Sequence, residues 1–428
     1  MKKGNPYLVP YVLITSLFFL WGLAHNLNPI LIPHLKKACQ LTDVESALID
    51  SAFFVGYFVM AIPAGLLMKR YGYKAGILVG LLLFTAGAFL FYPAAEVRVF
   101  SVFLLALFII ASGLTFLETA ANPYVITLGN PASATQRLNL SQSFNGLAAT
   151  LAPLLGGLFI LSGRSLSDAQ LARFSPAQLD RYLQEEAAAV QAPYAVIGAT
   201  VLLVALLIWR TRLPQIPAPA SVAATSVAAT SVAATSGGSI WQEKQLLFGV
   251  VTQFFYVGAQ VCVSSFFIRL MGQTAGLDER TAAYYLSVAL LGFMLGRFVG
   301  VLLMRYIAPN RLLALYGLLT FLLLGSAVLL GGPYALYALI AVQFFMSIMF
   351  PTIFSLSIYG LGDRTEFGSS LVIMAIAGGA IFPVLMGRVS DLSGIQTAYI
   401  VPTLCFLVVL VFGLTARTSD STVLTPTH

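Results

Sequence analysis

The strongest candidate for a chemical role in this sequence is a carboxylate inside an apolar run. Glu118 lies within SGLTFLETAANPYVITLGN, residues 112–130, a run about as long as hydrocarbon demands of a helix. An acid near mid-bilayer is costly unless it is neutralised or faces a wet cavity, so it is a functional candidate by default. Asn122 follows four residues later, on the same helix face, and Pro123 frees a backbone carbonyl. We predict that Glu118 takes up and releases a proton; the alternative is an acid that only bonds to a neighbouring helix.

Three amide side chains form a stripe at the start of the next apolar run, RLNLSQSFNG. Asn139, Gln142 and Asn145 are three residues apart and therefore share one helix face. Each amide both donates and accepts hydrogen bonds, which suits the hydroxyls of a sugar. For any one of them, a bond between helices is an equally good explanation.

The first apolar run is interrupted by polar residues and a proline in WGLAHNLNPILIPHL. His25 and Asn26 precede Pro29 at this point. A broken helix within a membrane favours a binding site, and a histidine titrates near neutrality. A lone histidine is, however, more often a hydrogen-bonded structural residue.

The second part of the chain carries a further polar stripe and a set of aromatic residues. The stripe follows helical spacing in QFFYVGAQVCVSS and consists of Gln253, Tyr256, Gln260 and Ser264. Phe350 precedes a proline in a later run, where an aromatic ring could stack on the apolar face of a sugar or simply pack against other helices.

Arg297 is the one base well inside an apolar run. We expect it to reach the surface or to bond to helix-end carbonyls rather than to contact a substrate. No arrangement of nucleophile and base, no phosphate-binding loop and no metal-binding spacing is present, so the motifs support no enzyme.

The elements that position these residues are membrane helices. The chain has 428 residues, of which 59% are hydrophobic and 9% charged, whereas roughly a quarter are charged in soluble domains. Runs of about 20 apolar residues predict two groups of six helices. The first group is 8–32, 47–68, 75–92, 100–126, 139–162 and 190–209, and the second is 246–268, 282–304, 312–331, 334–358, 368–388 and 397–416. The predicted fold is an all-α membrane protein with twelve transmembrane helices in two six-helix pseudo-symmetric halves.

A polar gap separates the two groups and predicts the domain boundary. We expect a first half over 1–212, a flexible cytoplasmic linker over 213–243, a second half over 244–416 and a cytoplasmic tail over 417–428. The linker repeats SVAAT three times and has little to bury. The segment from Pro176 predicts a short surface helix.

Lys and Arg outnumber Asp and Glu, which gives a net charge of +7, and apart from Arg297 they lie between apolar runs. They therefore indicate helix orientation rather than nucleic-acid binding, and they favour two cytoplasmic termini.

Six segments resemble the L-fucose/proton symporters, a branch of the major facilitator superfamily that also includes glucose/galactose transporters. The segments are FFLWGLAHNLNPILIPHL, PAGLLMKRYGYKAG, GLTFLETAANPYV, RLNLSQSFNG, QFFYVGAQVC and FPTIFSLSIYGLG. The resemblance implies import of a monosaccharide, L-fucose or a related hexose, in symport with protons by alternating access. It also implies a multi-pass protein of the cell inner membrane without a cofactor, which we expect to be a monomer.

The resemblance also implies roles for particular residues. Glu118 is similar to the family's glutamate for proton coupling and sugar binding. His25, which we single out from its own titration range, is the predicted second titrating group. Asn26, Gln142 and Asn145 are similar to polar site residues of the family. Together with residues taken from the patterns described above, the predicted sugar site comprises Asn26, Glu118, Asn122, Gln142, Asn145, Tyr256, Gln260 and Phe350.

Four positions depart from the family pattern. Pro29 stands where an aspartate is expected, Ser264 where a tryptophan is expected, and Phe350 where a tyrosine is expected. Lys69 replaces an acid of the loop motif, which puts the usual gating salt bridge in doubt.

Because the acid at position 29 is absent, sodium coupling and uniport remain alternatives. A sugar sensor that does not transport is an alternative of another class, although no sizeable cytoplasmic domain supports it.

Overall fold

The computed structural model describes residues 8–41, 43–159, 174–214, 239–277 and 279–418. Within these ranges the regular structure is entirely helical, as predicted. Helices satisfy their own backbone hydrogen bonds, which a chain surrounded by lipid requires. The SVAAT repeats lie outside the described residues.

The described residues of the first half form five long helices and one short helix. They are α1 (Leu8–Ala38), α2 (Asp43–Val97), α3 (Phe100–Thr127), α4 (Ala134–Phe159), α6 (Pro176–Ala188) and α7 (Gln191–Arg210). The predicted surface helix is α6. It begins at a capping box. The backbone N–H of Gln178 donates to the Ser175 hydroxyl, and the backbone N–H of Ser175 donates to the side-chain oxygen of Gln178.

The predicted helices 47–68 and 75–92 are joined within α2 at a single sharp reversal. Gly72 has φ 81° and ψ 170°, a conformation that residues with a Cβ rarely adopt. The chain folds back there, because the side chain of Met68 lies against Gly76. The loop predicted between residues 68 and 75 is therefore reduced to a reversal at Gly72.

The second half contains more helical segments, because several of its predicted spans are broken. Its helices are α8 (Lys244–Ser265), α9 (Phe267–Thr274), α10 (Glu279–Leu303), α11 (Pro309–Leu330), α12 (Gly332–Met346), α13 (Met349–Ser357), α14 (Thr365–Met374), α15 (Gly378–Ser393), α16 (Ile395–Ala398) and α17 (Ile400–Thr415). The predicted span 334–358 is divided between α12 and α13. Pro351 explains this break in part, since it has no N–H to donate to the carbonyl of Ser347.

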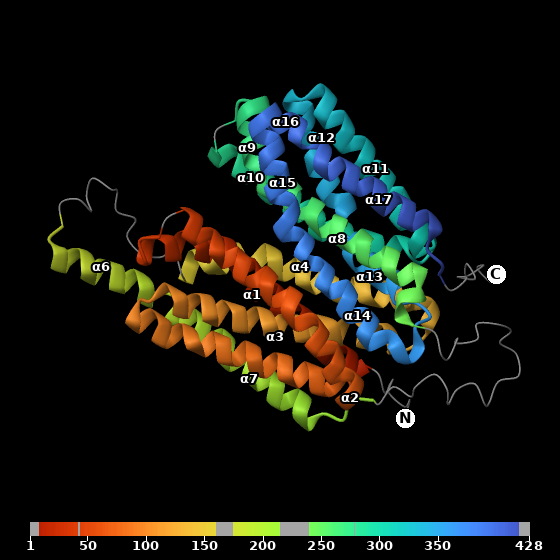
Figure 1. Ribbon diagram of the computed structural model, residues 1–428, viewed down its shortest axis with the longest axis horizontal. Helices are drawn as coiled ribbons and strands as arrows, with labels where there is room; N and C mark the ends of the chain where they lie inside the picture. Colours follow the sequence, from red (N-terminus) through yellow and green to blue (C-terminus); the bar gives the residue numbers. More distant parts are fainter. Residues whose placement is uncertain (1–7, 42, 160–173, 215–238, 278, 419–428) are drawn as a thin grey trace, which may run out of the picture.

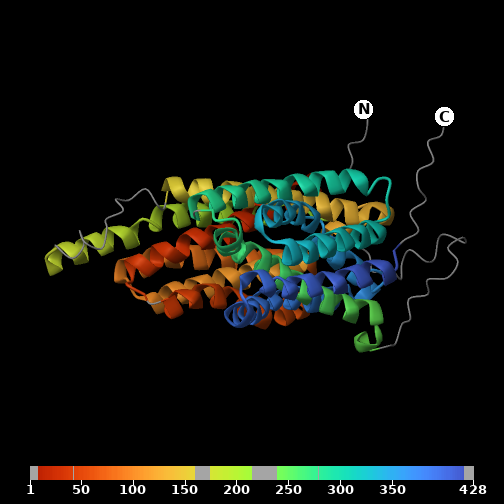
Figure 2. The ribbon, with the colours of Figure 1, turned by 90° about the horizontal axis from the view of Figure 1, so that it is seen from above.

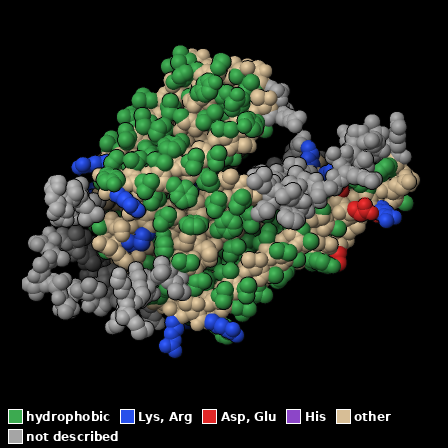
Figure 3. Space-filling view, turned by 180° about the vertical axis from the view of Figure 1, so that it is seen from behind, with side chains coloured by type: hydrophobic (Ala, Val, Ile, Leu, Met, Phe, Trp, Pro, Cys, Tyr) green, Lys and Arg blue, Asp and Glu red, His purple; other side chains and the backbone are tan. Residues whose placement is uncertain are grey.

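Ten helical segments among the described residues are long and apolar enough to cross a membrane. One of them, Ala52–Val97, has 46 residues and reverses at Gly72, so it supplies two crossings. The helix that carries the amide stripe, α4, completes the twelve. Hydrophobic side chains cover much of the surface, and visible charged side chains gather toward the ends of the molecule (Figure 3).

The two halves form two lobes whose helices run along roughly one direction (Figure 2). We call the end near Leu8 and Thr418 the termini end and the opposite end, which carries α6, the α6 end (Figure 1). The lobes meet through α2, α3 and α4 on one side and α10, α13 and α14 on the other. They diverge toward the α6 end (Figure 1).

Candidate functional site

Glu118 lies on the most interior stretch of α3, where every residue from Ile110 to Val125 is buried. Glu118 is 8% exposed and Tyr57, on α2, is 2% exposed. The Tyr57 hydroxyl donates a hydrogen bond of 2.7 Å to Oε1 of Glu118. The acid is therefore held by a second helix inside the first half.

Asn122, one turn from Glu118, contacts the amide stripe of α4. Nε2 of Gln142 donates to Oδ1 of Asn122 over 3.2 Å. Nδ2 of Asn122 is buried and has no partner among the described residues. An unpaired buried donor costs about 1–3 kcal/mol, so a ligand with an acceptor would gain most at this atom.

The residues predicted on α1 lie at its contact with α4. A Cβ on Gly22 would lie 3.0 Å from the Cα of Asn145, so only glycine permits this approach. Nδ2 of Asn26 donates to the Gly22 carbonyl of its own helix over 2.7 Å. The His25 side chain is exposed, and its ring meets that of Phe53 edge-on with 5.8 Å between centroids. The side chain of Pro29 is outside the described residues.

The three amides of the α4 stripe make two kinds of contact, one within the first half and one between the halves. Gln142 and Asn145 face Asn122 and Gly22 within the first half, as described above. Asn139, by contrast, donates to Oγ1 of Thr352 in α13 over 3.2 Å, and so joins the two halves. The alternative of a bond between helices therefore holds for Asn139.

The second half presents mainly aromatic side chains. Phe254, Phe255 and Phe382 form a cluster with ring centroids 5.1–6.2 Å apart, and Phe350 is partly buried. The predicted stripe of α8 divides in a similar way. Gln260 is partly buried, whereas Tyr256 is fully buried and donates to the Met346 carbonyl over 2.9 Å. The Tyr256 hydroxyl thus already has a partner inside its own half.

Arg297 of α10 bridges the halves close to these groups. Its Nε donates over 2.9 Å to the carbonyl of Ser347, which Pro351 leaves without its usual donor. Its NH1 donates to the carbonyl of Gln142 in the first half. The guanidinium also lies 4.8 Å from the Phe293 ring centroid. The prediction that Arg297 bonds to helix-end carbonyls is confirmed for Ser347.

The family model of the Major Facilitator Superfamily matches residues 13–375. This chain belongs to that superfamily. It is 44% identical over 418 residues to the L-fucose-proton symporter of Escherichia coli strain K12, covering 96% of this chain and 94% of the relative. It is 40% identical over 403 residues to a glucose/galactose transporter of Brucella abortus biovar 1, covering 94% of this chain and 92% of the relative.

The fold also matches a solved structure of the superfamily. A crystal structure of the transporter FucP in the outward conformation superposes with a TM-score of 0.87 at 43% identity, covering 97% of this chain and all of that one. The protein is thus a multi-pass membrane transporter and not an enzyme.

The two halves are in contact at the termini end although Lys69 stands where the loop motif of the family has an acid. Gly65 lies directly against Ser370 of α14. Glu366, also on α14, accepts a hydrogen bond from the Tyr73 hydroxyl and attracts Lys69. In this contact the base, Lys69, belongs to the first half and the carboxylate, Glu366, to the second. The expected motif has its acid in the first half.

Sequence reasoning missed Tyr57, and it did not predict which helix the hydroxyls of α13 would contact. Tyr57 is 61 residues from Glu118 and lies in an ordinary apolar run. Thr352 and Ser355 occur in the segment FPTIFSLSIYGLG, but nothing in their spacing identifies α4 as their partner. Only the packing of the helices brings these pairs together.

Proposed function

We propose that this transporter imports a monosaccharide, L-fucose or a related hexose, in symport with protons by alternating access. The observation that carries the proposal is the buried carboxyl of Glu118, bonded to Tyr57 at 2.7 Å and adjacent to the unpaired amide donor of Asn122. The names of the two relatives support the substrate class and the coupling ion.

Glu118 would carry the coupling because a neutral carboxyl is tolerated inside the membrane far better than a carboxylate. It would receive a proton from the open side, bind the sugar together with neighbouring amides, and release the proton on the other side. The proposed sugar site comprises Asn26, Glu118, Asn122, Gln142, Asn145, Tyr256, Gln260 and Phe350, with His25 as a second titrating group. Aromatic rings of the second half would supply the apolar face of the site.

We further propose that both termini are cytoplasmic and that the α6 end faces outward. The halves then correspond to 1–212 and 244–416, with the linker 213–243 and the tail 417–428 on the cytoplasmic side. In this orientation the lobes diverge toward the outside, where a sugar would enter. The setting would be the cell inner membrane, and the working unit a monomer.

Coupling to sodium, or uniport, is favoured by one observation. Pro29 occupies the position where the family pattern has a second acid. Glu118 would then bind sugar without coupling transport to a proton gradient.

The test uses proteoliposomes, a panel of radiolabelled sugars and imposed pH or sodium gradients. We expect accumulation of one hexose under an inward proton gradient, and its loss with a protonophore. Glu118→Gln should abolish accumulation but retain counterflow, because the amide still binds sugar but releases no proton. Glu185→Gln, an acid that is exposed on α6, is the matched control. Accumulation by Glu118→Gln would disprove proton coupling through this residue, and dependence on sodium would establish the alternative.

A further inference from the structure

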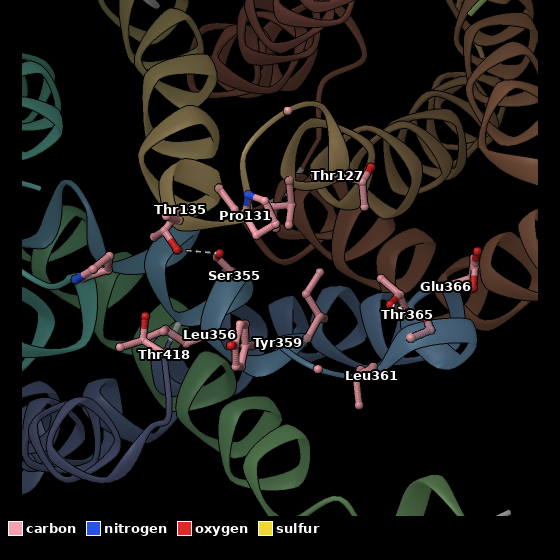
Figure 4. Close-up of a pocket in the computed structure, with 18 of the residues that line it drawn as sticks. Thr127, Pro131, Thr135, Ser355, Leu356, Tyr359, Leu361, Thr365, Glu366 and Thr418 are labelled. Carbon is pink, nitrogen blue, oxygen red and sulfur yellow. Dashed lines mark hydrogen bonds between the residues drawn. The ribbon is translucent and has the colours of Figure 1, made fainter. Parts of the chain in front are cut away.

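A cavity lies at the termini end, apart from the polar groups around Glu118. Its volume is about 480 Å³, and both halves line it (Figure 4). Tyr73, Thr127 and Thr135 contribute from the first half, and Ser355 and Glu366 from the second. Known small-molecule sites have volumes of about 300–1,000 Å³, so a compact ligand fits.

The deepest polar contact of this cavity is a pair of hydroxyl groups that joins the halves. Oγ1 of Thr135 and Oγ of Ser355 are 2.8 Å apart, and both side chains are buried (Figure 4). One turn further along α4, Asn139 bonds to Thr352. These contacts separate the cavity from Gln142 and Asn122. A molecule in the cavity would therefore rest on the contacts that close the termini end.

The lining indicates the chemistry of a ligand. It offers hydroxyl groups, two carboxylates (Asp363 and Glu366) and the rings of Tyr73 and Tyr359, and the described lining contains no lysine or arginine. Carboxylates and hydroxyls accept hydrogen bonds from a sugar, and an aromatic ring packs on its apolar face. An anion such as a sugar phosphate would be repelled.

Two bases lie near the margin of the cavity: Lys69, which interacts with Glu366, and Arg137, which lies beside Gly129. Arg137 already donates to the carbonyls of Ile126 and Asn130 and to the Ser133 hydroxyl. Its donors are therefore engaged by the turn before α4, and the acceptors of the cavity remain for a neutral ligand.

We propose that this cavity is a second sugar site, where a neutral monosaccharide on the cytoplasmic side binds across both halves and keeps that side closed. The identity of the ligand rests on the proposed function, since that side is where imported sugar accumulates. A ligand that needs both walls binds only while the walls are together, so it stabilises this conformation. Accumulated sugar would thereby slow its own further import.

The test measures how fast a maleimide labels Thr127→Cys in the purified full-length chain. Thr127 is exposed and lines the cavity, whereas two of the three native cysteines are buried and the third is partly buried. We expect the transported sugar to slow labelling at least about threefold, and to do so equally when Gln142→Ala disables the central site. Asn122→Ser replaces Gln142→Ala if the latter does not fold. Tyr306→Cys, which is exposed near the same end and outside the cavity, should be unaffected.

A second variant removes one wall of the cavity. Tyr359→Ala, at a 41% exposed residue, should abolish the protection of Thr127→Cys and reduce the bound sugar from two molecules per chain to one. Protection that disappears with Gln142→Ala would overturn the proposal, because it would then report only the central site. Equal protection by a sugar phosphate or by spermidine would overturn the assigned ligand class.

The two proposals fail in different ways. Transport with one sugar bound per chain and no protection of Thr127→Cys would refute only the second site. Absence of any sugar binding or uptake by the wild-type chain would refute the proposed function itself.

Discussion

The two halves of this transporter share a six-helix architecture but place different chemistry at their interface. The first half contributes a carboxyl, a phenol and amides, represented by Glu118, Tyr57 and Asn122, on helices that are otherwise apolar. The second half contributes a cluster of phenylalanine rings and the guanidinium of Arg297. Pseudo-symmetry therefore describes the scaffold and not the site.

The difference shows how polar groups are tolerated within a membrane protein. Tyr57 and Asn122 have partners inside the first half, so their bonds do not depend on how the halves are placed. Arg297 instead joins Ser347 of its own half to Gln142 of the other, so one of its bonds must break when the halves separate. The first half thus holds a preformed site, whereas the second half holds a group whose bonding depends on conformation.

The largest expected effect comes from removing Arg297. Arg297→Ala leaves the Ser347 carbonyl without a donor and breaks the bond to Gln142, and each unpaired buried group costs about 1–3 kcal/mol. We expect a loss of about 2–4 kcal/mol in unfolding free energy and severely reduced uptake. Thermal unfolding of the purified protein and initial uptake rates measure the two effects.

Arg297→Lys should restore little, because an ammonium group cannot reproduce the fork that reaches two carbonyls. Arg305→Ala, at an exposed base beyond the end of α10, is the control. Full uptake by Arg297→Ala would show that the bonds of this guanidinium are not essential for transport, and would remove Arg297 from the comparison.

An intermediate effect is expected for Tyr57→Phe. A hydrogen bond to a charged group contributes about 1.5–3 kcal/mol, and a hydroxyl donor favours a carboxylate over a neutral carboxyl. Without the hydroxyl, the Glu118 carboxylate loses this hydrogen-bond donor. The midpoint of the pH profile for uptake should therefore move up by about one unit.

Tyr256→Phe provides the matched change in the second half. It removes a bond of 2.9 Å to the Met346 carbonyl and touches no acid, so the pH midpoint should stay in place. An equal shift in both variants would mean that the coupling is shared between the halves. Weaker sugar binding by Tyr256→Phe would show that its hydroxyl leaves Met346 to contact the sugar.

The sequence predicts features that depend on local spacing. The twelve crossings follow from apolar runs, and Glu118 and Asn122 share a face because they are four residues apart. Pro351 marks in advance the carbonyl that loses its donor. The carboxyl was identifiable from the cost of placing an acid in lipid, which needs no tertiary information.

Contacts between distant segments could not be predicted in this way. Tyr57 and Glu118 are separated by 61 residues, and Asn139 and Thr352 by 213. Hydropathy gives each helix a buried face but not the neighbour that covers it. The division of one amide stripe between the sugar site and the contact of the halves depends on how α4 packs against α13.

The smallest expected effect concerns the second buried acid of the first half. Glu186 of α6 is 9% exposed and pairs with Lys37 at 2.9 Å. Its carbonyl is 2.8 Å from Nε2 of His34, which lies beyond the apolar span that ends at Leu27. These contacts attach α6 to α1 at the α6 end. If the preformed site alone carries the proton, this cluster should affect stability and not coupling.

The pH dependence of this cluster follows from His34. Burial lowers the pKa of the His34 imidazole, although the contacts with Glu186 oppose the shift and Lys37 adds to it. A group with a lowered pKa in the folded state stabilises the fold above its unfolded value and loses that contribution as the pH falls. The melting temperature should therefore decrease by about 2 °C as the pH drops below about 6.5.

His34→Gln should remove this decrease while leaving the pH profile of uptake unchanged. Glu185→Gln, which changes an exposed residue on the same helix as Glu186, is the matched control. A shift in the uptake profile with His34→Gln would place a second titrating group in the transport cycle. The division between a coupling acid, Glu118, and a structural acid, Glu186, would then no longer hold.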